Sequence, residues 1–199
     1  NHSIFFSLYS LAHRSQAGDW LLIFLSEVFG FIFFFLAFIL LALYKDGTFS
    51  IKIPFKYFKF KFKELFIIFF PATFSWIFAT IFKGIITSPR PFVLFDSIEP
   101  LFIHGGLDSF PSGHSIFFAS LATSMFFVDR RIGYLFSIVA LLVGISRVAS
   151  GVHFPIDILV GYIAGIIISY SLIIYSRNSK NPNPPHVPAH VPATGPTCG

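Results

Sequence analysis

Residues 20–44 read WLLIFLSEVFGFIFFFLAFILLALY, and Glu27 is the single acid or base among them. An apolar run of about 18 residues or more can cross the hydrocarbon core of a bilayer, which is roughly 30 Å thick. An open chain crosses lipid as a helix, because its backbone polar groups must be satisfied within the segment. The alternation typical of a membrane β-barrel is absent from residues 31–43. This stretch therefore predicts a membrane-spanning helix.

The composition of the whole chain favours the same class. Of its 199 residues, 55% are hydrophobic and 12% are charged, and the mean hydropathy is +0.78. Soluble domains carry about 25% charged residues, so the composition argues against a soluble globular domain, and it excludes disorder across the body. Cys198 is the only cysteine, which excludes a disulfide framework and a cysteine-based metal site. The net charge of +5 does not indicate nucleic acid, because the bases follow the membrane topology instead.

Further apolar runs predict four more spans, over residues 65–82, 112–128, 132–149 and 156–175. Residues 3–14 are too short to span and carry their apolar side chains on one helical face, as an interfacial helix does. The expected fold is all-α: a polytopic membrane bundle of five spanning helices plus an N-terminal interfacial helix. A six-helix form stays open if residues 1–17 insert more deeply. We expect one membrane domain over 1–177 and a disordered, proline-rich tail over 178–199.

The distribution of basic residues predicts the orientation. The loop after the first span contains KIPFKYFKFKFK over residues 52–63, and placing it in the cytoplasm also puts Arg130, Arg131 and Arg177 inside. This lysine stretch is either a topology anchor or a site for anionic lipid. The outer side then receives four polar segments that a membrane protein usually avoids near its spans, which makes each a functional hypothesis. They are KGIITSPRP (83–91), FPSGHS (110–115), GISRVAS (144–150) and HFPID (153–157).

The first three segments carry groups that suit an oxyanion. Lys83, Arg90 and Arg147 supply positive charge, and a guanidinium can bind two oxygens at once. Ser112 is placed to cap the helix that follows, whose free N–H groups can bind phosphate. Each segment also has an ordinary explanation, because Lys83 and Arg147 could reach the membrane interface and Ser112 could serve only as a cap.

The fourth segment adds a candidate nucleophile. His153 and Asp157 are one helical turn apart, so the carboxylate can hold one imidazole nitrogen and leave the other free to attack. Compensation of the helix dipole is the alternative role for Asp157. The topology brings all four segments to the outer face, and the acids are not grouped at metal-ligand spacing. We therefore expect phosphate chemistry with a histidine nucleophile and neither metal nor cofactor.

These residues resemble the type 2 phosphatidic acid phosphatase superfamily, which also includes vanadium haloperoxidases. The family pattern K-x6-RP, PSGH and SR-x5-H-x3-D matches Lys83 to Pro91, Pro111 to His114 and Ser146 to Asp157 at every fixed position and in order. The resemblance implies that His153 is the nucleophile and forms a phosphohistidine, oriented by Asp157. It implies that His114 protonates the leaving oxygen and then activates water. The phosphoryl oxygens would be bound by Lys83, Arg90, Ser112, Gly113 and Arg147.

The membrane body and the small size are similar to bacterial undecaprenyl-diphosphate phosphatases of the bacitracin-resistance type. Such an enzyme would lie in the bacterial cell (inner) membrane, with its site on the outer or periplasmic face and a lipid phosphate as substrate. Many of that group have Asp in place of Gly113, so phosphatidylglycerophosphate and lipid A phosphatases remain alternatives. A non-catalytic lipid transporter is a remote alternative. Glu27 either lines the headgroup entrance or hydrogen-bonds another helix, and the 87–111 loop is expected to be a lid or recognition element.

Overall fold

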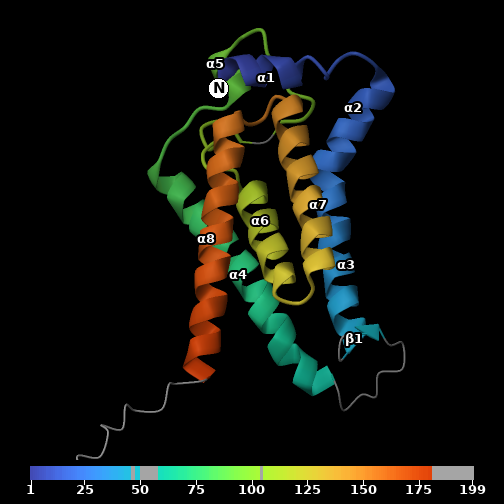
Figure 1. The fold of residues 1–199 in the computed structure, drawn as a ribbon. Coiled ribbons are helices and arrows are strands. Elements are labelled where there is room, and N and C mark those ends of the chain that lie inside the picture. The colour runs from blue at the N-terminus through green and yellow to red at the C-terminus, as the bar shows by residue number, and fades with distance from the viewer. Residues whose placement is uncertain (46–47, 50–57, 104, 181–199) are drawn as a thin grey trace, which may run out of the picture.

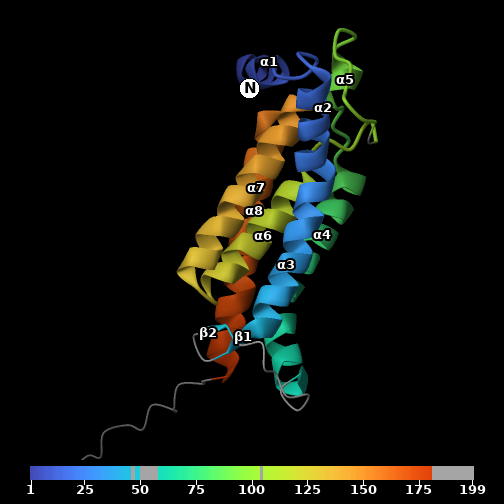
Figure 2. The same ribbon diagram turned by 90° about the vertical axis from the view of Figure 1, so that its right-hand side faces the viewer.

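The computed structural model describes residues 1–45, 48–49, 58–103 and 105–180. Long helices run side by side, and a short helix lies across one end of the bundle (Figures 1 and 2). The elements are α1 (His2–Tyr9), α2 (Gln16–Ile23), the π-helical turn η1 (Phe24–Val28), α3 (Phe29–Leu43), β1 (Tyr44–Lys45), β2 (Thr48–Phe49), α4 (Phe58–Ile85), α5 (Pro91–Leu94), α6 (Gly113–Phe126), α7 (Arg130–Ala149) and α8 (Pro155–Lys180).

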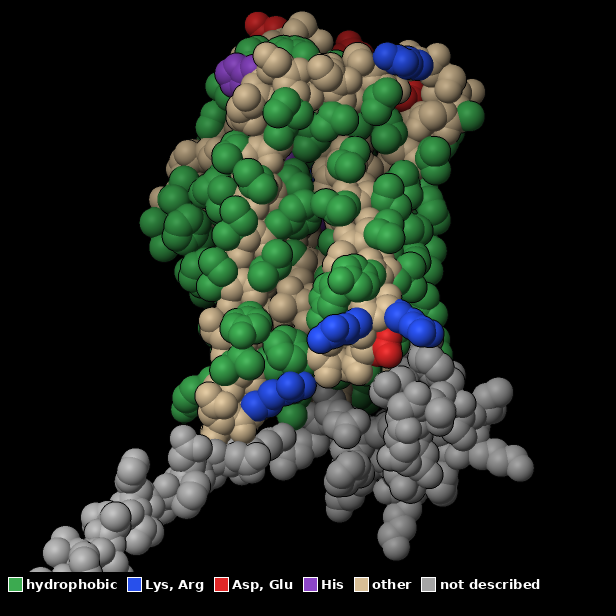
Figure 3. Space-filling model, viewed as in Figure 1, with side chains coloured by type: hydrophobic (Ala, Val, Ile, Leu, Met, Phe, Trp, Pro, Cys, Tyr) green, Lys and Arg blue, Asp and Glu red, His purple; other side chains and the backbone are tan. Residues whose placement is uncertain are grey.

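Within the described residues, four helical stretches are long and apolar enough to cross a membrane. They are Gln16–Ile39, Leu65–Ile85, Arg130–Ala149 and Pro155–Ser179. The expected all-α class and four of the five predicted spans are therefore confirmed. Hydrophobic side chains cover the sides of the bundle, and charged ones gather at its ends, as a lipid environment requires (Figure 3).

The fifth predicted span is shorter than expected. Helix α6 has 14 residues, which at 1.5 Å per residue gives about 21 Å, less than a bilayer core of roughly 30 Å. It is packed against α4, α7 and α8, and nine of its residues are buried. Its hydrophobic character thus reflects burial within protein, not contact with lipid. Residues 1–17 form no span either, because α1 lies across the end of the bundle (Figure 1).

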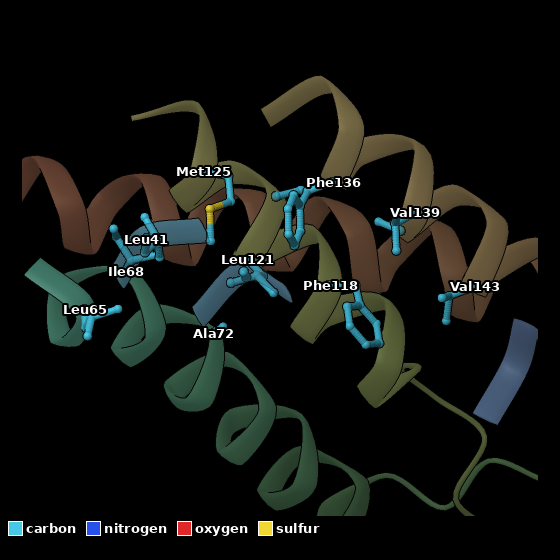
Figure 4. Close-up of a cluster of buried hydrophobic side chains, with 13 residues drawn as sticks. Leu41, Leu65, Ile68, Ala72, Phe118, Leu121, Met125, Phe136, Val139 and Val143 are labelled. Atoms are coloured by element: carbon cyan, nitrogen blue, oxygen red, sulfur yellow. The ribbon is translucent and has the colours of Figure 1, made fainter. Parts of the chain in front are cut away.

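The core of the bundle surrounds α6. Phe118, Leu121 and Met125 of α6 lie among side chains from the neighbouring helices (Figure 4). Helix α8 approaches α6 closely: a Cβ atom at Gly161 would lie 3.0 Å from the Ser112 carbonyl oxygen, and one at Gly165 would lie 2.3 Å from the Ile116 carbonyl oxygen. These glycines, on the second and third turns of α8, let that helix pack closely against the start of α6, which begins in one of the polar segments.

A second apolar cluster fixes α1 to the end of the bundle. Phe5 is fully buried and packs with Ile98, Val148 and Phe154. A helix is therefore present where one was predicted, although it ends at Tyr9, and its interfacial location stays a prediction. Helix α8 continues to Lys180, three residues beyond the predicted domain boundary. Residues 181–199 of the predicted 178–199 tail, and the first half of the 52–63 lysine stretch, lie outside the described residues.

Candidate active site

His153 and Asp157 lie together at the start of α8. His153 Nδ1 is 3.5 Å from Asp157 Oδ2, and both side chains are buried. Pro155 opens the helix, as proline favours at a first helical position. The Phe154 N–H donates to Asp157 Oδ2 at 2.8 Å, and the Ser112 N–H donates to the Asp157 carbonyl at 3.2 Å. The first bond orients the carboxylate, and the second ties the backbone at the start of α8 to the segment that opens α6.

Ser109 completes this pair, and the sequence reasoning missed it. Its hydroxyl oxygen is 2.5 Å from Asp157 Oδ2 and 3.4 Å from His153 Nδ1. A carboxylate oxygen accepts hydrogen bonds, so the Ser109 hydroxyl donates to Asp157 and turns a lone pair toward His153. This arrangement favours the tautomer with its proton on Nδ1, which leaves Nε2 as the nitrogen with an available lone pair. The polar pair Asp108 and Ser109, shortly before Pro111, was the one signal of this contact in the sequence.

The protonation state of His153 suits a nucleophile. Burial, followed by the positive charges of Arg147 and Arg90, holds the pKa of His153 well below its ordinary value of 6.5. The imidazole is therefore neutral at pH 7. A neutral imidazole carries the free electron pair that attack on phosphorus requires.

Lys83 and Arg90 converge on Asp108. The Lys83 ammonium donates to the Asp108 carbonyl at 2.6 Å and lies 3.9 Å from Oδ2. Arg90 Nε and Nη2 donate to the two carboxylate oxygens at 3.0 and 3.3 Å, while Nη1 donates to the Val152 carbonyl at 3.0 Å. The Arg90 guanidinium is buried, and each of its nitrogens has a partner.

Asp108 is a fixed negative charge within this cationic region. Burial alone would raise its pKa, but the hydrogen bonds and charge of Arg90, together with the charge of Lys83, lower that pKa to about 2. The carboxylate is therefore ionised at all physiological pH values. Backbone hydrogen bonds of Ser88 with Leu107 and Ser109 join the two ends of the 87–111 loop. This part of the loop thus holds site residues in place, and the lid role expected of the loop stays a hypothesis.

Arg147 occupies the other side of the site, at the end of α7. Its side chain is fully buried, and its Nη1 donates to Glu27 Oε1 at 2.9 Å and to the Ser26 carbonyl at 3.4 Å. Its Nε and Nη2 atoms are buried and have no hydrogen-bond partner within the part of the chain that the structure describes. Buried guanidinium N–H groups left unpaired cost free energy, so this edge is arranged for an anion.

The first turn of α6 borders the same region. Ser112 caps the helix by accepting from the Ser115 N–H, and its side chain is buried. Gly113 follows, and a Cβ atom there would lie 3.6 Å from Trp76, an ordinary contact, so packing does not require glycine. The His114 ring lies beside Phe118, with centroids 6.4 Å apart. The N–H groups of this turn add a second anion-binding element.

The structure therefore brings most predicted site residues together. The charges of Lys83, Arg90 and Arg147 all act on His153, although these residues come from different elements. Ser112 joins this cluster through the Asp157 carbonyl. Among the described residues, no group of three or more His, Cys, Asp or Glu is arranged to hold a metal ion.

An apolar groove begins beside the first turn of α6. It has a volume of about 520 Å³ and runs between α3, α4 and α6. Gly113 and His114 lie in its wall, together with aromatic side chains. The remaining lining residues are Phe31, Phe34, Phe35, Thr73, Trp76, Phe117 and Phe118. A long apolar chain attached to a phosphate could therefore lie here while its headgroup reaches the polar site.

Comparison with known proteins yields one family. The model of the PAP2 superfamily matches residues 64–181. The undecaprenyl-diphosphatase BcrC of Bacillus subtilis is 28% identical over 180 residues, which cover 88% of this chain and 84% of that protein. A bacitracin transport permease protein BcrC of Bacillus licheniformis is 37% identical over 39% of this chain, a match that spans only 38% of the relative's length. A lipid A 1-phosphatase of Rhizobium johnstonii is 33% identical over 55% of this chain and 47% of its own length.

Two solved structures share the fold. LpxE of Aquifex aeolicus has a TM-score of 0.68 at 22% identity, covering 88% of this chain and 95% of that one. A transmembrane PAP2 type phosphatidylglycerolphosphate phosphatase of Bacillus subtilis has a TM-score of 0.67 at 20% identity, covering 90% and 88%. Together with the family match over the polar segments, they confirm the family that the motifs predict. The chain therefore belongs to the PAP2 superfamily, as a membrane-embedded, metal-independent lipid phosphatase.

Proposed function

We propose that this protein removes the terminal phosphate of a lipid diphosphate through a phosphohistidine at His153. Undecaprenyl diphosphate is the best-supported substrate. One observation carries the proposal. A buried, neutral imidazole is oriented by Asp157 and Ser109, and its pKa is lowered by Arg147, whose guanidinium edge is unpaired. A nucleophile and an anion-binding group thus share one buried site.

In the first step, His153 Nε2 attacks the terminal phosphorus, and a bond forms between nitrogen and phosphorus. The bond from phosphorus to the bridging oxygen breaks, and His114 gives that oxygen a proton. The positive charge that develops on His153 is stabilised by Asp157 on the Nδ1 side. Arg147 and the N–H groups of the first α6 turn bind the phosphoryl oxygens, with Lys83, Arg90 and Ser112 beside them.

In the second step, a water oxygen attacks the same phosphorus while His114 takes its proton. The bond between His153 and phosphorus breaks, inorganic phosphate leaves, and the electron pair returns to Nε2. The proton that His114 gained restores it as an acid. General acid and base catalysis of this kind contributes about 10²–10⁴-fold to the rate. No step needs a metal or an organic cofactor.

The choice of a polyprenyl diphosphate has two supports. One relative that aligns over most of both chains is an undecaprenyl-diphosphatase. The groove beside His114 is apolar and aromatic, which suits a hydrocarbon chain leading away from the headgroup. Many such enzymes have Asp in place of Gly113, and a Cβ atom at this position would meet only ordinary contacts, so the backbone here has the same room that a side chain would need.

Phosphatidylglycerophosphate and lipid A are the alternative substrates. The lipid A 1-phosphatase match and the fold shared with a phosphatidylglycerolphosphate phosphatase favour them. The site chemistry would be the same for all these lipids. We place the protein in the bacterial cell membrane with the site on its outer face. The support is that the site lies at the end of the bundle opposite β1, Arg130 and Arg131.

Phosphate release by the purified protein in detergent tests the proposal. Undecaprenyl diphosphate, phosphatidylglycerophosphate, phosphatidic acid and lipid A are compared in the presence of EDTA. We expect release fastest from undecaprenyl diphosphate, loss of release in His153→Ala, and retention in the histidine control His13→Gln. A monophosphate preference would move the protein to phospholipid or lipid A metabolism. Release from none of the lipids, or full activity in His153→Ala, would contradict the proposal.

A further inference from the structure

The first long helix is interrupted by a π-helical turn that carries a partly buried acid. Turn η1 (Phe24–Val28) separates α2 from α3, and Glu27 lies within it. Single π-turns inside α-helices are rare and occur frequently at functional sites. An ionisable residue within a span is costly unless it is paired. The family match begins at residue 64, so neither the turn nor Glu27 belongs to the matched segment.

Glu27 contacts the cation of the candidate active site. Its Oε1 accepts from Arg147 Nη1 at 2.9 Å, and the neighbouring Ser26 carbonyl accepts a longer bond from the same nitrogen. The Glu27 side chain is one-third exposed, whereas Arg147 has no exposed surface. Glu27 thus joins the first span to the end of α7 and, through Arg147, to the site around His153.

The geometry determines which edge of the guanidinium stays open. Glu27 and Ser26 engage only Nη1, while Nε and Nη2 are buried and find no partner among the described residues. Nε and Nη2 are adjacent donors on one edge of the planar group, and this fork matches two oxygens of a phosphate. By holding Nη1, Glu27 fixes the rotation that presents this fork. Phe102 lies over the guanidinium at 5.8 Å and restricts it further.

We infer that Glu27 is a positioning residue for phosphoryl transfer, which orients Arg147 from the π-turn of the first span. This inference rests on the proposed function. Glu27 also balances the buried charge of Arg147 before substrate binds, because a buried cation without a counter-charge is strongly destabilising. The alternative is a helix-to-helix tie that stabilises the fold and leaves the chemistry unaffected.

Kinetics of Glu27 variants separate these roles. We expect Glu27→Ala to lower kcat about 10²-fold, because small misplacements of a binding group have effects of that size. Glu27→Gln keeps an oxygen acceptor but loses the charge, so a smaller loss, about 10-fold, is expected. Val28→Ala is the matched control, since Val28 lies in the same turn and is exposed. It should keep the kcat and KM of the unchanged protein.

Two further readouts would not respond to a purely structural role. Orthovanadate imitates five-coordinate phosphorus, so its inhibition constant should weaken in step with kcat in both Glu27 variants. In an Arg147→Ala background, Glu27→Gln should have no further effect on kcat, because its target is gone. Thermal unfolding of each variant in detergent reports whether the fold is retained.

The outcomes distinguish the two proposals. If the unchanged protein releases phosphate and folded Glu27→Gln has the same kcat and vanadate inhibition, the positioning role is wrong. Full additivity with Arg147→Ala would also contradict it. If Glu27→Ala does not fold, Glu27→Gln decides alone. If the unchanged protein hydrolyses no lipid phosphate, the proposed function fails, and vanadate binding to Glu27→Gln still tests the positioning of Arg147.

Discussion

The two buried arginines of the site differ in how far their charges are already neutralised. On the loop side, every nitrogen of Arg90 has a partner, through Asp108 and the Val152 carbonyl. On the helix side, Arg147 uses one nitrogen on Glu27 and Ser26 and keeps two unpaired. Both side chains are almost completely buried. The hydrogen-bond donors of the loop side are therefore all satisfied within the protein, whereas those of the helix side are all satisfied only when an anion is bound.

The largest expected effect comes from the open fork on the helix side. Arg147→Lys keeps the charge but offers a single donor group in place of two parallel ones. We expect kcat/KM for the preferred lipid phosphate to fall about 10²–10³-fold, as when one transition-state donor is removed elsewhere. The variant should still fold, as measured by thermal unfolding in detergent. Activity within a factor of two of the unchanged protein would show that the fork does not bind the phosphoryl group.

For the stability of the fold the order is reversed, and replacement of Arg90 should cost more than replacement of Arg147. Arg90→Met removes a satisfied network and leaves the Val152 carbonyl unpaired, so the free energy of unfolding should fall by about 1–3 kcal/mol. Arg147→Met removes two unpaired buried nitrogens, and Glu27 can turn toward solvent, so a smaller loss is expected. The melting temperatures of the two variants measure this difference. Equal losses would contradict the contrast between the two sides.

The contribution of the loop side to the stability of the fold should fall in acid and stay unchanged near neutral pH. The pKa of Asp108 is lowered from 3.8 to about 2, so this group stabilises the fold fully above its unfolded value. That contribution is lost as the pH falls from about 4 to 2. Asp108→Asn should therefore show a shallower decline in melting temperature over this window than the unchanged protein. Parallel declines would mean that Asp108 is not held by Arg90 and Lys83 in solution.

Phe102 provides the smallest expected effect. Its ring lies 5.8 Å from the Arg147 guanidinium, near the outer limit of a cation–π contact, where a contribution of about 0.5–1 kcal/mol is expected. Phe102→Leu should raise KM about two- to fivefold with kcat nearly unchanged. A tenfold loss of kcat would show that the ring does more than restrict the guanidinium.

Hydropathy was a reliable guide to most of the fold and failed at α6. The outer helices face lipid, so the length of their apolar runs is the length of the span. Helix α6 is enclosed by protein, where a bilayer imposes no length, and its serines bond to neighbours such as Ser75 and Ser169. Such an enclosed helix has the same apolar composition as a span, so composition could not distinguish them.

The site was predictable where a local pattern carries it. The spacing of His153 and Asp157 on one helix, and the bases near span ends, could be recognised from the order of residues. The partners that decide how these groups behave could not. Glu27 reaches Arg147 across 120 positions of sequence, and Ser109 reaches Asp157 across 48. These contacts depend on how helices pack, which no short pattern records.

The central claim is that His153 carries the phosphoryl group between the two steps. The most direct test uses the His114→Asn variant, in which the water that completes turnover lacks its base. The first step can still proceed in this variant, because the phosphate leaving group of a diphosphate departs without an acid more readily than an alcohol does. The purified variant is mixed with terminally labelled undecaprenyl diphosphate and quenched in alkali, and its peptides are analysed by mass spectrometry. The account predicts a phosphate on His153 that is stable in alkali and labile in acid, and none in His114→Asn combined with His153→Ala. Label on any residue other than His153 would contradict it, as would undiminished turnover in His153→Ala.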